Sequence, residues 1–101
     1  MDFKVNLEYD GEMPVVVVTG DLDFDTSPHL AKCLQQLIEG NHTTFCVDLS
    51  GVEYMDSEGL KALIKAYHEL KGKGKIQVRG THGSIRRIFE ISGLHKLFDI
   101  K

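Results

Sequence analysis

Apolar and polar residues alternate near the N-terminus, as they do in a strand with one buried face. The apolar or aromatic positions within residues 3–9 are Phe3, Val5, Leu7 and Tyr9. Asp10-Gly11 then supplies a turn, and residues 15–18 form a continuous run of valines. Such a β-branched run favours a central strand that is covered, or nearly covered, on both faces. The pattern predicts an edge strand that turns back into a central strand ending at Gly20.

The next apolar residues recur at helical spacing. They are Leu30, Cys33, Leu34, Leu37 and Ile38. We expect this helix to begin at Thr26 or Ser27 and to carry Pro28 in its first turn, where the missing amide hydrogen costs nothing. Gly40-Asn41 ends the helix.

A second strand-to-helix unit follows. Its strand has apolar residues at the alternate positions Phe45, Val47 and Leu49. Its helix has them at helical spacing, at Leu60, Leu63, Ile64 and Tyr67. The period changes at Asp56-Ser57, and either of these side chains can accept a hydrogen bond from the unpaired amides of the first helical turn.

The last third of the chain repeats the unit in a shorter form. Residues 76–78 form a short strand after the glycine-rich break at residues 72–74, and a helix begins near Ser84. The helix buries Ile85, Ile88 and Phe89. It ends at Gly93, which can adopt the left-handed cap conformation. The remaining apolar residues fold back on the core; they are Leu94, Leu97 and Phe98.

The order of these elements predicts an α/β fold. We expect a mixed, mostly parallel sheet of about four to five strands with helices packed on it, because right-handed crossovers join the later strands. The first strand joins as an antiparallel edge. Residues 1–101 form one domain, long enough to bury roughly 60 to 65% of the surface that the unfolded chain exposes. Such a domain folds without a disulfide, a metal or a cofactor.

Charge and composition narrow the class of function. The net charge of −3 indicates neither a nucleic-acid nor a membrane partner, and the basic residues of the later third lack interleaved aromatics. The chain begins without a signal pattern and has no apolar run of about 20 residues, so we expect a cytoplasmic protein. Cys33 and Cys46 lack the spacing of a zinc site, and we interpret both as reduced structural thiols.

Acidic residues gather near the ends of two predicted strands. They are Asp21, Asp23, Asp25, Asp48, Glu53, Asp56 and Glu58. The loops at residues 21–26 and 51–57 follow neighbouring strands, and partners dock at this edge of a parallel sheet. We therefore expect Ser57 to share a surface with the acidic residues. A phosphate on Ser57 would add about −1.5 to −2 charges, face the exposed amides of the helix start and repel a partner's carboxylates.

The run at residues 47–60, Val-Asp-Leu-Ser-Gly-Val-Glu-Tyr-Met-Asp-Ser-Glu-Gly-Leu, resembles the signature of the STAS family of bacterial anti-sigma factor antagonists. The tetrapeptide at residues 20–23, Gly-Asp-Leu-Asp, resembles the Gly-x-Leu-Asp turn of that family. Residues 91–98 resemble its closing segment. The resemblance covers essentially the whole chain.

This resemblance implies a switch in bacterial signalling. The unmodified protein would bind an anti-sigma factor that is also an ATP-binding serine kinase, and so release a sigma factor. The kinase would phosphorylate Ser57, and a serine phosphatase would restore it. The protein would be a binding protein and not an enzyme, and a monomer or weak dimer. The residues implied in partner binding are Asp21, Asp23, Asp56, Glu58, Gly59, Leu60 and Lys61.

Four of these residues also have structural interpretations. Asp56 orients or caps Ser57, and Leu60 anchors the helix. Gly59 either lets a partner's backbone come close or supplies the small residue that a tight helix start needs. Asp23 is either a partner contact or a solvated turn aspartate.

The sequence departs from the usual family pattern at two positions after the serine. Glu58 replaces a small residue and would repel a phosphate on Ser57. Lys61 lies four residues beyond Ser57, one helical turn away, and would offset part of that repulsion.

Two other classes of function compete with the switch. A hydrolase would need a histidine beside Ser57 and Asp56, but the 5 histidines are scattered over helices and loops. A STAS-type scaffold, or a small anion- or nucleotide-binding signalling module, would use the amides of the same helix start. An ordinary nucleotide site would have a Gly-x-x-x-x-Gly-Lys-Ser/Thr loop or a Gly-x-Gly-x-x-Gly element. The chain has neither motif.

Overall fold

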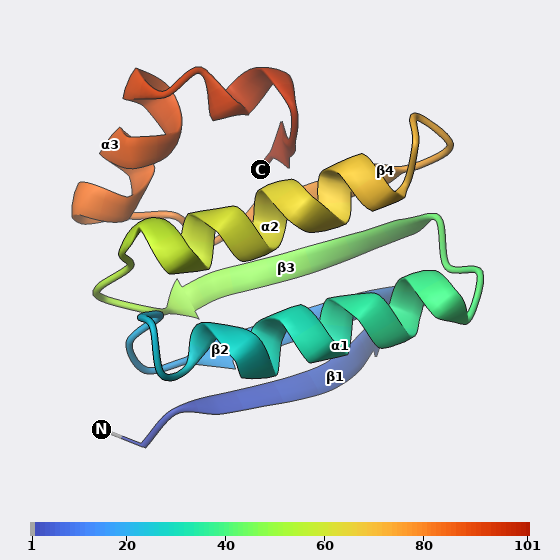
Figure 1. Ribbon diagram of the computed structural model, residues 1–101, viewed down its shortest axis with the longest axis horizontal. Helices are drawn as coiled ribbons and strands as arrows, with labels where there is room; N and C mark the ends of the chain where they lie inside the picture. The colour runs from blue at the N-terminus through green and yellow to red at the C-terminus, as the bar shows by residue number, and fades with distance from the viewer. Residues whose placement is uncertain (1) are drawn as a thin grey trace.

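Strands and helices form close to the positions that the apolar pattern predicts. The computed structural model describes residues 2–101. The strands are β1 (Lys4–Asp10), β2 (Met13–Thr19), β3 (Thr44–Gly51), β4 (Lys75–Arg79) and β5 (Asp99–Ile100). The helices are α1 (Ser27–Glu39), α2 (Ser57–Glu69) and α3 (Gly83–Ile91), followed by a short 3₁₀ turn, Leu94–Lys96 (Figure 1).

The sheet has five strands in the order β1-β2-β3-β4-β5. β1 pairs with β2 in the antiparallel sense, and every other neighbouring pair is parallel. This confirms the predicted mixed, mostly parallel sheet with an antiparallel edge strand. β5 forms the opposite edge through a short pairing in which Asp99 and Ile100 lie beside Gln77 and Val78 of β4.

The helices cover one face of the sheet. Each parallel strand pairs with the strand before it in the chain, so right-handed crossovers stack the helices on the same side. Figure 1 shows α1 and α2 lying side by side across this face. The apolar core fills the space between the two layers and includes Val16, Val18, Leu30, Leu34, Phe45, Val47, Leu49, Leu63, Ile85 and Phe89.

The opposite face of the sheet carries no helix within residues 2–101. Residues 15–18 are still covered, or nearly covered, on both faces, as the valine run predicts. Val15 is nevertheless only 1% exposed, because Glu8 of β1 and Cys46 of β3 flank it in register. Val17 lies on the same face and is partly exposed. Neighbouring strands therefore supply the cover on this face of the sheet.

A charged pair crosses this open face. The Arg79 Nε of β4 donates to the Asp48 Oδ2 of β3 over 2.9 Å. The other carboxylate oxygen, Oδ1, accepts from the Ser50 amide at 2.9 Å and from the Ser50 hydroxyl at 2.7 Å. Partial burial alone would raise the pKa of Asp48, but the hydrogen bonds from Ser50 and Arg79 outweigh it and leave this pKa below its usual value.

The Asp48 network makes stability depend on acid pH. Because the folded-state pKa is lowered, its stabilisation is complete above the unfolded pKa of about 4 and is lost as the pH falls through the folded value. We expect Asp48→Asn to lower the free energy of unfolding by about 1 kcal/mol at pH 7. The difference from wild type should shrink near pH 2 in urea denaturation. Asp2→Asn, a change at an exposed position, should match wild type at both pH values, and an undiminished Asp48→Asn deficit in acid would contradict the network.

The two cysteines are packing residues in this fold. Cys46 is buried in β3, and Cys33 is half-buried on α1; both thiols are free. Burial raises the pKa of each thiol, which lowers its reactivity at neutral pH. No cluster of three or more His, Cys, Asp or Glu side chains within residues 2–101 is placed to hold a metal ion. α1, α2 and α3 all fall short of the length and apolarity that a membrane-spanning helix requires.

Candidate functional site

The loops that follow β2 and β3 run side by side beyond the ends of the strands. Leu22 and Met55 form an isolated parallel bridge between them. Three backbone hydrogen bonds join the loops: Gly20 N to Gly51 O at 3.0 Å, Leu22 N to Tyr54 O at 2.9 Å, and Asp56 N to Leu22 O at 3.0 Å. Figure 1 shows both loops at the end of the sheet where the arrowhead of β3 lies. We call the two loops, residues 20–26 and 51–56, the joined loops.

Buried apolar side chains hold the joined loops against the start of α2. Leu22 and Met55 are both buried. Gly59, on the first turn of α2, faces them so closely that an added Cβ would lie 2.7 Å from the Met55 Cγ and 3.1 Å from the Leu22 Cβ. This contact favours the packing interpretation of Gly59, which is itself buried.

Asp56 caps α2. Its Oδ1 accepts a hydrogen bond from the Glu58 amide at 2.8 Å and a longer one from the Gly59 amide at 3.4 Å. Ser57 is the first residue of the helix, and it is exposed. Of the two residues predicted as possible caps, Asp56 therefore has this role, and the Ser57 side chain is left at the surface.

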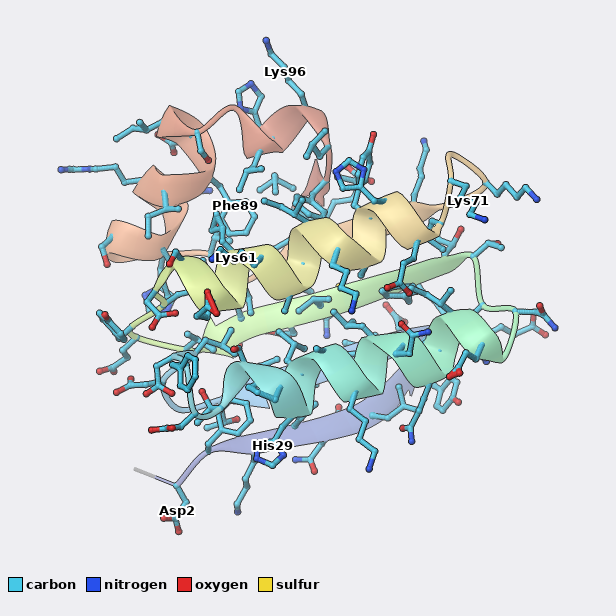
Figure 2. The ribbon with its side chains drawn as sticks, in the orientation of Figure 1. Asp2, His29, Lys61, Lys71, Phe89 and Lys96 are labelled. Atoms are coloured by element: carbon cyan, nitrogen blue, oxygen red, sulfur yellow. The ribbon has the colours of Figure 1, made fainter. Side chains whose placement is uncertain are left out.

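The cap changes the expected surroundings of a phosphate on Ser57. The amides of Glu58 and Gly59 already donate to Asp56, so they are not free to receive phosphate oxygens. The Glu58 carboxylate is paired with the Lys61 ammonium at 3.0 Å, and Lys61 lies at the Ser57 end of α2 (Figure 2). Lys61 is thus the cation one turn from Ser57, and the occupied amides disfavour a permanent anion site here.

Asp23 organises the loop before α1. Its Oδ1 accepts from the amides of Asp25 and Thr26, each at 3.0 Å. The Thr26 hydroxyl in turn donates to the Asp21 carbonyl at 2.7 Å and accepts from the Asp23 amide at 2.9 Å. Asp23 is therefore a turn-forming residue as well as a candidate contact, whereas the side chain of Asp21 is exposed.

The comparison with known families agrees with this arrangement. A family model described as "Mlab, STAS domain" matches residues 5–99. The chain belongs to the STAS domain family. The resemblance seen in the sequence is thereby confirmed.

Relatives of this STAS domain are named as anti-sigma factor antagonists. It is 33% identical over 89 residues to an anti-sigma-B factor antagonist of Listeria monocytogenes, which covers 85% of this chain and 76% of the relative. A crystal structure of an anti-sigma factor antagonist from Mycobacterium paratuberculosis has a TM-score of 0.89 and 28% identity, covering 98% of this chain and 85% of that one. The Bacillus cell fate determinant SpoIIAA in its phosphorylated form shares the fold, with a TM-score of 0.76, 22% identity and coverage of 97% and 91%.

The STAS domain brings most of the predicted site residues to one end of the sheet. Asp21 and Asp23 lie in one of the joined loops, and Asp56 caps the helix that begins at the end of the other. Glu58 and Lys61 form an ion pair on α2, whereas Leu60 is partly buried against the core, as expected of a helix anchor.

Sequence reasoning missed two aromatic residues of the joined loops. Phe24 is 73% exposed and Tyr54 is 54% exposed. The available signal was that neither residue falls on the apolar face of a predicted strand or helix.

The packing of Gly59 can be tested directly. We expect Gly59→Ala to lower the free energy of unfolding by about 1 to 3 kcal/mol, because Met55 must move from its buried position to admit the methyl group. Urea denaturation at neutral pH measures the change. Ser57→Ala, two residues away but exposed, should stay within about 0.5 kcal/mol of wild type. Equal stability of Gly59→Ala and wild type would mean that the joined loops do not pack tightly on α2.

Proposed function

We propose that this STAS domain is an anti-sigma factor antagonist, a regulatory binding protein whose unmodified form binds an anti-sigma factor and releases a sigma factor. The observation that carries the proposal is the exposed Ser57 on the first turn of α2, directly after the joined loops. The names of its relatives support a partner of this kind. Proposed contacts are Asp21, Asp23, Asp56, Glu58, Leu60 and Lys61; Gly59 contributes through the packing of the helix start.

The proposal includes reversible phosphorylation of Ser57. The anti-sigma factor would be an ATP-binding serine kinase that modifies Ser57, and a serine phosphatase would remove the phosphate. The phosphate would lie beside the carboxylates of Asp56 and Glu58. Its nearest counter-ion on the same helix face would be the Lys61 ammonium, which would leave Glu58 and pair with the phosphate instead. Because Ser57 is exposed and is not the cap, the fold would tolerate this charge.

The same charge would prevent partner binding. At about 7 Å and an effective dielectric constant of about 40, each added charge facing a partner carboxylate costs on the order of 1 kcal/mol. About two such charges weaken association by roughly 30-fold, before any steric exclusion is counted. A phosphate on Ser57 would therefore dissociate the complex while the antagonist stays folded.

The test uses purified ATP-binding anti-sigma factors of the source organism, each incubated with ATP and this protein. Intact-mass measurement should find one phosphoryl group on wild type and none on Ser57→Ala. Ser84→Ala is the matched control, since Ser84 is also an exposed serine at the start of a helix, and it should be phosphorylated like wild type.

Binding supplies the second half of this test. Ser57→Asp should fold like wild type but bind the same anti-sigma factor at least about 10-fold more weakly, because one added charge and its bulk meet the partner. Phosphate on another residue, or undiminished binding by Ser57→Asp, would refute the switch at Ser57.

A further inference from the structure

Phe24 and Tyr54 expose aromatic rings on the two joined loops. Their exposed fractions, 73% and 54%, are those of side chains that face water. Neither residue belongs to the core or to the partly buried apolar residues that pack against it, whereas Leu60 and Tyr67 do. The fold therefore gains little from these rings, and both are available to contact a partner.

Backbone geometry holds both residues outward. Tyr54 precedes Met55, which is buried at the bridge to Leu22, and neighbouring residues of an extended segment point to opposite sides. Phe24 lies at the tip of a turn that Asp23 closes through the amides of Asp25 and Thr26. Their exposure thus follows from hydrogen-bonded loops.

The residues around the two rings are acidic. Asp21, Asp25 and Glu53 are exposed next to them in the joined loops, and residues 20–26 and 51–56 include no lysine or arginine. Protein interfaces use aromatic side chains as anchors that fill pockets, because a ring buries a large area at a small cost in conformational entropy. Acidic residues around such anchors match a basic rim on the partner.

From this we infer that Phe24 and Tyr54 are the main affinity determinants for the partner, inserting into apolar pockets of an anti-sigma factor whose rims carry arginine or lysine. This inference rests on the proposed function and adds to it the chemistry of the partner's surface. Ser57 would control whether the complex forms, and the two aromatic residues would supply most of its affinity.

The experiment is calorimetric titration of wild type and variants with each purified ATP-binding anti-sigma factor of the source organism. We expect Phe24→Ser to weaken binding by about 30-fold or more and Tyr54→Ser by about 10-fold, the range of hot-spot residues. Ile91→Ser is the matched control. Ile91 is 78% exposed at the end of α3, outside the joined loops, and its replacement should leave the affinity within about twofold.

Conservative variants separate an apolar contact from a change in loop shape. Phe24→Leu and Tyr54→Phe keep an apolar side chain and should retain most of the affinity. Thermal unfolding of each variant by circular dichroism should match wild type, since both side chains face water. Asp25→Asn should slow association and weaken its dependence on salt, because the partner's rim is basic.

The possible outcomes distinguish the inference from the proposed function. If wild type binds an anti-sigma factor and the serine variants bind it equally well, the aromatic anchors are refuted and the antagonist function stands. Equal losses in Phe24→Ser and Phe24→Leu would also refute the apolar contact. If wild type binds none of the anti-sigma factors, the proposed function falls, and the inference falls with it.

Discussion

The pairing of β2 with β3 is the constraint on which the rest of the site depends. It continues past the ends of both strands through backbone hydrogen bonds between the two loops and through the bridge of Leu22 with Met55. Because this bridge also packs on Gly59, the start of α2 is positioned by the same contact. A parallel sheet brings loops to one edge, but here hydrogen bonds fix their relative position. Distances across the candidate surface are therefore set by the backbone.

Most of the fold follows from the sequence because its periods are long and unbroken. The helical stripes of α1 and α2 leave little choice of element or of buried face. The alternation over residues 3–9 predicts the strand β1 correctly, but not its buried face, because Leu7 and Tyr9 stay 44% and 58% exposed at this edge of the sheet. The bare face of the sheet could not be predicted, since a run of valines looks the same whether a helix layer or the side chains of neighbouring strands cover it. β5, with two residues, is too short to produce any period.

At the candidate site, the sequence predicted which residues come together more reliably than it predicted what each one does. Asp56 and Ser57 are both good caps, and only the backbone conformation assigns the role to Asp56. From the sequence, Asp23 looks like a solvated turn residue, whereas in the structure its carboxylate closes the turn by accepting two backbone hydrogen bonds. Phe24 and Tyr54 lie outside every periodic segment, so pattern analysis had no reason to assign them a role.

At the start of α2 one residue caps the helix and the next carries the proposed phosphorylation site, and this separation has a consequence for protein turnover. Asp56 caps the helix and Ser57 is exposed, so a chemical change at the serine hydroxyl would alter the stability of the fold little. A cell that modifies Ser57 would then keep the same quantity of protein, because proteolysis follows the population of unfolded molecules. The signal would then be the phosphorylated fraction of a constant amount of this protein. Dephosphorylation would reverse the signal without new protein synthesis.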